Sequence, residues 1–361
     1  MLNGTLDLLK REVDAVLPNP VWIAELLRAM GYTRHLDAPN AVARAEGIAA
    51  LLTGHDKYVY PHDLIAGSIR GILGDAETVP PAELAYAAEL CQSYGRNGFH
   101  TNNDHYAPDY EGLLRDGVGG TLRRIETSRE AHRDDPDASK HDFLRAARIA
   151  LTAFSTMIAQ YGDRAAAMAR EAGDDARRSQ LSEVARICHK ISSDKPDTFR
   201  EALQLVWLCH VAFVCEGRYA MALGRLDQYL YPFYRSDLER GALTDEDAVE
   251  LLCCMMYKIG ERRLFGGDDV VNIAVAGRRP DGTGGVNPLS TLLVEAVKRC
   301  NIPGPNLSAR LYEGIDDAFI DACLVSIGTG LGYPALMNDE VNIPALARWG
   351  YAPEVSHVFA F

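Results

Sequence analysis

The spacing of apolar residues changes once along the chain, near Gly260, and this change limits the folds that the sequence can adopt. Before it, apolar residues recur with the 3.6-residue period of amphipathic helices, as in the wide apolar face that begins at Phe199. After it, short extended runs at 270–276, 306–311 and 333–339 alternate with helical patterns. Strand, helix, strand, helix, strand is the order found in an α/β barrel or layered sheet. The sequence therefore predicts a helix-rich α/β protein.

Composition narrows the class of protein. The chain has 361 residues, 47% of them hydrophobic, which is ample for a packed core and excludes global disorder. A formal net charge of −13 argues against a general nucleic-acid or anionic-membrane binder, because either would need a basic face. The longest apolar run, 203–215, contains His210 and is too short to cross a membrane, and the N-terminus does not resemble a signal peptide. We expect a soluble, cytoplasmic protein.

The cysteines and the helix signals favour structural interpretations. The eight cysteines form no CxxC pair, so free thiols in a reducing compartment are expected. The adjacent pair 253–254 lies among Leu and Met in a helical pattern, which favours core packing over redox chemistry. His210 falls on the apolar helix face and is predicted to be a core histidine. Thr198 with Glu201, and Thr244 with the acidic residues after it, predict capped helix starts.

A polar, turn-rich loop at 95–110 is the first candidate for chemistry. It contains His105 and Asp109, and a histidine and a carboxylate in one loop can form an acid/base pair. Asp109 could instead cap the helix predicted to begin at Tyr110. Both interpretations of Asp109 remain open at this point.

The same loop offers a metal-binding alternative. His100, Asp104 and His105 lie within six residues, and imidazole and carboxylate groups bind metal ions. Such a set arises often by chance in an irregular loop, so no metal site is predicted, and a metal hydrolase is kept only as a weaker alternative.

Further polar residues fall where a parallel sheet would gather them. Arg225 and Asp227 are predicted to form a buried charged network that ties helices to the sheet. Arg218 could bind an anionic substrate group or form a surface ion pair. The candidates for substrate binding at strand ends and turns, where a structural role is an equal alternative, are Asn306, Ser308, Arg310, Asn338 and Asp339.

Five phrases occur together in a specific order. They are HYAPDYEGLLRDGVGG (105–120), FREALQLVWLCHV (199–211), LGRLDQYLYPFYRSDLERGALT (223–244), PNLSARL (305–311) and YPALMNDEV (333–341). Together they resemble the glycyl radical enzyme family, the pyruvate formate-lyase-like superfamily. The resemblance extends from about residue 40 to the end, and its most specific parts are the phrases that begin at Gly224 and Tyr333.

The resemblance implies a fold and a chemistry. The expected fold is a helical N-terminal region followed by the first half of a ten-stranded α/β barrel. In this family a radical on a glycine near the C-terminus takes hydrogen from a cysteine thiol, and the thiyl radical abstracts hydrogen from the substrate. A radical SAM activating enzyme installs the glycyl radical, so this chain is expected to bind no cofactor directly. His105 and Asp109 lie in the motif that places polar groups against the substrate in the dehydratase branch.

The sequence also departs from the family pattern. The thiyl cysteine of the family follows the phrase that matches 352–361, and this sequence ends there. We therefore expect a helical region over 1–195 and a half-barrel start over 196–361, truncated before the thiyl-cysteine loop. The apolar run 355–361 is predicted to be a buried strand. At 217–222 the His-Ser pair of the polyol dehydratases is missing, which argues against glycerol or propanediol as substrate.

These departures lead to two main functional expectations. The first is the N-terminal part or subunit of a glycyl radical lyase, dehydratase or formate acetyltransferase-like enzyme, inactive alone. Its partners would be a C-terminal half or second subunit with the thiyl cysteine and radical glycine, the activating enzyme and a small polar substrate, and the complete enzyme would be a homo-oligomer. The alternative is a non-catalytic half-barrel that serves as an interaction scaffold.

Overall fold

The computed structural model describes residues 4–15, 20–75, 81–83, 85–86, 89, 106–218, 220–261, 271–352 and 355. Its α-helices are α1 (Gly4–Asp14), α2 (Ala24–Thr33), α3 (Asn40–Gly54), α5 (Tyr110–Ala131), α6 (Ala138–Glu171), α7 (Asp175–Ile191), α8 (Phe199–Cys215), α9 (Leu226–Tyr229), α10 (Tyr231–Glu239), α11 (Asp245–Ile259), α12 (Pro288–Cys300), α13 (Asp317–Ser326) and α14 (Asp339–Arg348). The strands are β1 (Pro20–Trp22), β2 (Leu73–Asp75), β3 (Asn272–Ala276), β4 (Asn306–Leu311) and β5 (Ala335–Asn338).

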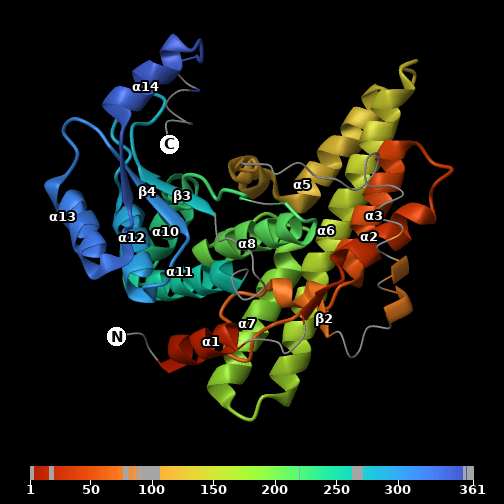
Figure 1. Ribbon diagram of the computed structural model, residues 1–361, viewed down its shortest axis with the longest axis horizontal. Coiled ribbons are helices and arrows are strands. Elements are labelled where there is room, and N and C mark those ends of the chain that lie inside the picture. The colour runs from red at the N-terminus through yellow and green to blue at the C-terminus, as the bar shows by residue number, and fades with distance from the viewer. Residues whose placement is uncertain are drawn as a thin grey trace.

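The molecule has a helical body on one side and a smaller α/β part on the other (Figure 1). In the helical body, α6 packs against α3 and α7. The buried helix α8 lies between the two parts, and α11 packs on α12 in the α/β part. The two long helices α6 and α7 are separated near Gly173, because α6 ends at Glu171 and α7 begins at Asp175. No helix among the described residues is long and apolar enough to span a bilayer.

Helix α8 forms the centre of the core. Its predicted apolar face is buried, and His210, 3% exposed, stacks on Trp207 with ring centroids 5.5 Å apart, so the predicted core histidine is confirmed. Thr198 caps the helix by accepting from the backbone N–H of Glu201 at 3.2 Å. The reciprocal half of the predicted capping box is wrong: the Glu201 carboxylate accepts from Lys190 Nζ at 2.6 Å and from a preceding backbone N–H, because a nearby cation competes for it.

The predicted strands form one parallel sheet in the order β3-β4-β5. Ala274 pairs with Ser308, and Ser308 with Ala335, so the three strands are in a defined register. The expected change from helices to alternating strands and helices is confirmed. The predicted strand over 355–361 lies outside the described residues apart from Val355, which is helical and 37% exposed.

The first ninety residues differ from the sequence-based expectation of helices alone. An irregular stretch follows α3, and β1 and β2 form a short antiparallel pair. Glycines explain part of the difference. Gly67 has a φ of +116°, which excludes a helix at this position. A Cβ at Gly71 would lie 1.8 Å from the backbone oxygen of Asp56, so this close backbone contact requires glycine.

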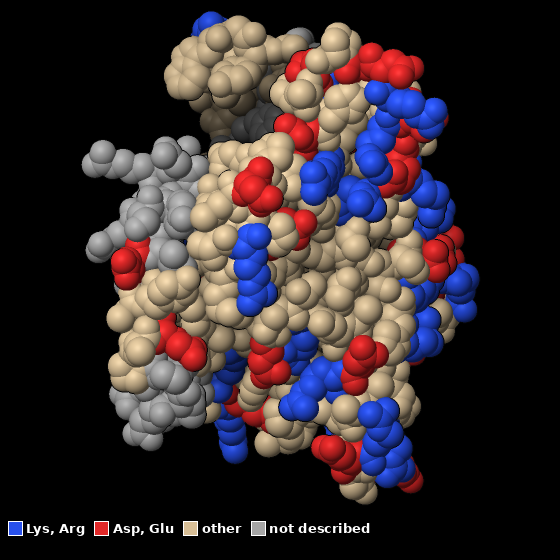
Figure 2. Space-filling model, turned by 90° about the vertical axis from the view of Figure 1, so that its right-hand side faces the viewer, with Lys and Arg blue, Asp and Glu red and all other residues tan. Residues whose placement is uncertain are grey.

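The outer surface of the helical body carries both charge signs. Figure 2 shows basic and acidic side chains interspersed on this face. Several form local ion pairs, such as Arg124 with Asp116 at 2.8 Å and Arg129 with Glu126 at 2.7 Å. Mixed exposed charges of this kind contribute little to stability individually and mark a solvated face.

Candidate active site at the carboxyl edge of the parallel sheet

A pocket of about 530 Å³ lies where two parallel segments of the sheet end. Residues 222–224 run beside β3 and are joined to it by a parallel bridge between Gly224 and Ile273. Arg225 follows this segment directly, and the turn 277–285 follows β3. Arg225 and two residues of the turn, Arg279 and Pro280, border the pocket. Ligands of open parallel sheets bind outside the carboxyl ends of the strands. The pocket is lined by Ala107, Pro108, Asp109, Tyr110, Glu111, Leu223, Gly224, Arg225, Gln228, Tyr229, Arg279 and Pro280.

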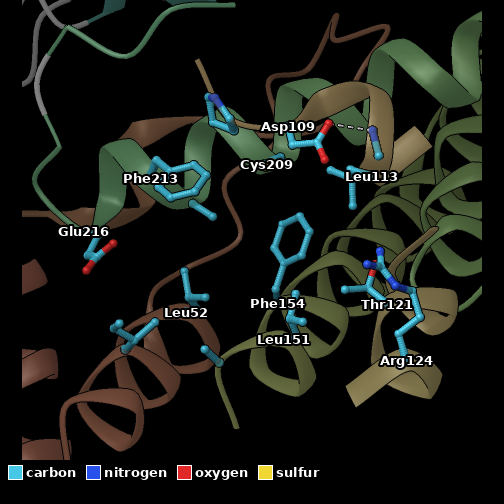
Figure 3. Close-up of a pocket in the computed structure, with 15 residues that line it drawn as sticks. Leu52, Asp109, Leu113, Thr121, Arg124, Leu151, Phe154, Cys209, Phe213 and Glu216 are labelled. Atoms are coloured by element: carbon cyan, nitrogen blue, oxygen red, sulfur yellow. Dashed lines mark hydrogen bonds between the residues drawn. The ribbon is translucent and has the colours of Figure 1, made fainter. Parts of the chain in front are cut away.

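Asp109 lies at the pocket and caps α5. Its Oδ1 accepts from the backbone N–H of Gly112 at 2.8 Å, the bond drawn in Figure 3. A Cβ at Gly112 would come within 2.3 Å of Asp109 Oδ2, so the close cap depends on glycine at this position. The capping alternative is therefore what the structure contains. The carboxylate is nevertheless exposed and borders the pocket, so it can also meet a ligand.

The turn after β3 brings Arg279 to the same pocket. The backbone N–H of Arg279 donates to the carbonyl of Thr283 at 2.8 Å, and its carbonyl accepts from Gly282 at 2.8 Å. Its Nε donates to Oε1 of Gln228 at 3.3 Å. Neither Arg279 nor Gln228 was among the site residues predicted from the sequence. The available signal was the position of this turn directly after a buried strand, which in a parallel sheet is the edge where sites form.

Arg225 and Asp227 bind the end of β3. Arg225 donates to the carbonyl of Ala276 at 2.5 Å, and Asp227 Oδ2 accepts from the backbone N–H of the same residue at 2.7 Å. Asp227 also accepts from Ser290 Oγ at 2.5 Å. Burial raises the pKa of Asp227, and burial with neighbouring cations lowers the pKa of Arg225 to about 10. Both side chains hold the last residue of β3 against α9.

Arg310 and Asp339 form a buried, two-pronged ion pair. Nε and Nη2 of Arg310 lie 2.8 and 2.9 Å from the two carboxylate oxygens of Asp339, and both side chains are fully buried. Asp339 also accepts from the backbone N–H of Arg278 at 2.7 Å. The pair thus joins β4, the start of α14 and the turn after β3. Neither residue borders the described pocket.

The candidates on β4 lie away from this pocket as well. Asn306, at the start of β4, accepts a hydrogen bond from the Tyr333 hydroxyl at 2.5 Å. Ser308 is half-buried in the middle of the strand. Both stand on the sheet itself, on the same side as Ala274, while the pocket lies beyond the sheet's edge.

Asn338 and Arg218 also have local partners. Asn338 caps α14 by accepting from the backbone N–H of Glu340 at 2.9 Å. Arg218 lies 3.4 Å from a carboxylate oxygen of Glu216, just after α8. The structure therefore brings Asp109 and Arg225 together with Arg279 at one pocket and distributes the other candidates over the sheet and helix ends.

Two predicted features involve residues outside those that the structure describes. They are the acid/base candidate His105 and the alternative metal-binding set of His100, Asp104 and His105. Among the residues that the structure describes, no group of three or more metal-binding side chains comes together. The seven described cysteines are free, none of them borders the pocket at the sheet edge, and burial raises the thiol pKa of several, Cys209 included, to about 12.

A second pocket of about 410 Å³ opens on the other side of Asp109 (Figure 3). Helices α3, α5, α6 and α8 enclose it, and its wall is mostly apolar, with Leu52, Phe154 and Phe213 among the lining side chains. Asp109 and Pro108 border both pockets and separate them. The apolar pocket offers few groups for chemistry, so the pocket at the sheet edge is the better candidate for an active site.

Comparison with known proteins gives consistent matches. The family model described as Pyruvate formate lyase-like matches residues 82–359. The probable dehydratase YbiW of Escherichia coli (strain K12) is 32% identical over 281 residues, which cover 73% of this chain and 35% of YbiW. Trans-4-hydroxy-L-proline dehydratase of Clostridioides difficile is 31% identical over 232 residues, 60% of this chain and 29% of that enzyme.

The fold comparison agrees. The glycerol-bound B12-independent glycerol dehydratase from Clostridium butyricum matches with a TM-score of 0.88 at 23% identity, over 99% of this chain and 53% of that one. This likeness shows the fold, part of a glycyl radical enzyme barrel, and confirms the predicted fold class. The chain spans about half the length of the solved structure and about a third of the two sequence relatives.

Proposed function

Because the chain belongs to the pyruvate formate lyase-like family of glycyl radical enzymes, we propose that it forms the helical and first half-barrel part of a glycyl radical lyase acting on a small polar metabolite. The observation that carries the proposal is the pocket at the carboxyl edge of the parallel sheet, which is bordered by Asp109 and two arginines. Its volume of about 530 Å³ suits a small ligand. A lyase is favoured over an acyltransferase because the relatives are named dehydratases, a decarboxylase and a sulfite-lyase.

In this proposal the chain's own residues bind and orient the substrate. The exposed Asp109 carboxylate accepts a hydrogen bond from a substrate hydroxyl, and His105, four residues earlier, transfers a proton to the departing group. The glycyl radical, installed by a radical SAM activating enzyme, supplies hydrogen abstraction through a cysteine thiol. No described cysteine reaches the pocket, so that thiol is proposed to come from another part of the complete enzyme.

The free edge of the sheet is the proposed place for a second half-barrel. Within the described residues β5 pairs only with β4, so its other edge is open. Large apolar side chains on β5, on α14 and directly after α14 are exposed, among them Leu336 at 44%, Val341 at 57% and Trp349 at 81%. An open strand edge beside exposed apolar groups is a site for association. The relatives' additional length supports a second half as the occupant.

The proposal is tested by reconstitution under anoxic conditions. This chain is combined with a chain that carries a second half-barrel, a thiyl cysteine and a radical glycine, and the complex is treated with a radical SAM activating enzyme. We expect turnover on at least one member of a panel that includes a hydroxyproline, a hydroxysulfonate and a short diol. Stable assembly and a glycyl radical without turnover of any panel member would contradict a lyase and favour the scaffold alternative.

A further inference from the structure

The pocket at the sheet edge contains an arginine, Arg279, that forms no salt bridge with a carboxylate among the described residues. Arg279 is half-buried, and its guanidinium has one hydrogen bond within the described residues, from Nε to Gln228 Oε1 at 3.3 Å. Gln228 is itself held by donating to the carbonyl of Gly285 at 2.7 Å. Asp281, two residues further along, accepts from the backbone N–H and the hydroxyl of Thr283 at 2.9 and 2.6 Å; these bonds lower the pKa of its carboxyl, and the charge of Arg279 adds to the effect without a salt bridge. The other guanidinium N–H donors of Arg279 have no hydrogen-bond acceptor among the described residues.

The neighbouring Arg278 shows what a satisfied arginine looks like in the same turn. It pairs with Glu340 at 2.5 Å, and its guanidinium lies 5.2 Å from the centroid of the Tyr312 ring. It does not border the pocket. Arg278 therefore has a structural role, whereas the adjacent Arg279 faces the pocket.

The turn that carries Arg279 is fixed from several sides. Arg225 donates to the carbonyl of Arg278 at 3.1 Å, and Asp339 accepts from the backbone N–H of Arg278 at 2.7 Å. The backbone of Arg279 is closed by its two bonds within the turn. A guanidinium on a fixed turn binds a ligand with a smaller loss of conformational entropy than one on a mobile loop.

The wall opposite Arg279 is formed by the start of α5 and carries acidic side chains. The first segment of α5 faces the pocket through Tyr110 and Glu111, and the non-helical Gly117 separates this short segment from the rest of α5. Asp109 already accepts from Gly112 at the helix start, and Glu111 is exposed at the rim. The positive end of the pocket is thus the Arg279 and Arg225 side, and the acceptor end is the Asp109 side.

We infer that Arg279 binds the acidic group of the substrate, which is a short organic anion, a carboxylate or sulfonate that also carries a hydroxyl. The guanidinium offers a planar pair of donors that matches two oxygens of such a group. The hydroxyl then lies toward Asp109. This inference rests on the proposed function only in taking the sheet-edge pocket as the substrate site.

The experiment is a binding titration that needs no radical and no turnover. The chain is titrated by NMR with lactate and, separately, with 1,2-propanediol, which carries a neutral CH₂OH in place of the carboxylate. We expect lactate to bind at least 10-fold more tightly than the diol. Arg279→Gln should weaken lactate binding by about 10- to 100-fold, as expected for loss of hydrogen bonds to a charged group, and leave diol binding unchanged. The matched control Arg278→Gln, which removes the same charge from the same turn, should change lactate binding less than 2-fold.

Several results would overturn the inference. These are equal binding of lactate and the diol, equal losses in the two glutamine variants, and no binding of lactate at all. The outcomes separate this inference from the proposed function. Lactate binding through Arg279 in a reconstituted enzyme without turnover would leave the anion site intact, whereas turnover of a hydroxycarboxylate by Arg279→Gln with wild-type kcat and KM would leave the lyase intact and refute the anion site.

Discussion

Replacing Asp339 by asparagine should destabilise the fold strongly. Arg310 and Asp339 are fully buried and share two hydrogen bonds of 2.8 and 2.9 Å. Asparagine keeps the size of the side chain but leaves the guanidinium as a buried cation without its counter-charge and places an amide N–H₂ against another donor. Breaking a buried ion pair on one side costs about 3–5 kcal/mol. A typical domain has a free energy of unfolding of about 5–15 kcal/mol, so the loss is a large part of the total.

The assay is urea unfolding followed by circular dichroism, with Glu340→Gln as the matched control. Glu340 is the next residue and pairs with Arg278 at the surface, where its side chain is 46% exposed, so its loss should cost less than about 1 kcal/mol. The double variant Arg310→Met with Asp339→Leu removes both charges and should recover most of the loss. If Asp339→Asn unfolds within about 1 kcal/mol of the wild type, the ion pair is not a structural element, and a substrate-binding role for these residues returns.

Three further predictions follow from other parts of the structure. Asp109→Ala should lower the free energy of unfolding by about 1 kcal/mol while Asp109→Asn changes it little, since asparagine also caps helices; equal losses in thermal unfolding would show that the charge matters beyond the cap. Burial and the nearby Lys57 lower the pKa of His55 to about 4, so the unfolded chain takes up this proton first on acidification and stability is lost as the pH falls from 6.5 to 4. Over that range the free energy of unfolding of the wild type, measured in urea at several pH values, should fall by about 3 kcal/mol relative to that of His55→Gln. The same pH dependence of the free energy of unfolding in both proteins would refute this. In a reconstituted enzyme, His105→Ala should reduce turnover about 10²–10⁴-fold at normal radical content and change stability by about 1 kcal/mol or less, and near-normal turnover would exclude the acid/base role.

The sequence predicted the elements whose signals are local. The period of apolar residues predicted α8, and β-branched runs predicted β3, since burial of one helix face or of a whole strand leaves a direct trace in the sequence. Asp109 was predicted as a possible helix cap because a capping residue directly precedes the helix in the sequence. Thr244 forms both halves of its capping box with Asp247, and within the part of the chain that the structure describes no cation forms an ion pair with that carboxylate.

Features that depend on long-range contacts were missed or left open. The irregular stretch that contains Gly71 is fixed by close approach to Asp56, which residue spacing does not reveal. Whether Arg310 and Asp339 bind a ligand or each other depends on a contact across 29 residues. Arg279 and Arg278 look equivalent in the sequence, and only the fold shows which of them faces the pocket.

We propose that this chain forms half of a barrel and that a second half completes it at β5. Native mass spectrometry of the protein, purified from its own host under anoxic conditions, tests this proposal. We expect this chain, which has a mass of 39.6 kDa, to be found together with a second half-barrel, either in one polypeptide or in a stable complex. The total mass should be roughly twice that of this chain, because the chain covers about half of the related structures. A species that contains this chain alone, stable and without further mass under those conditions, would contradict it.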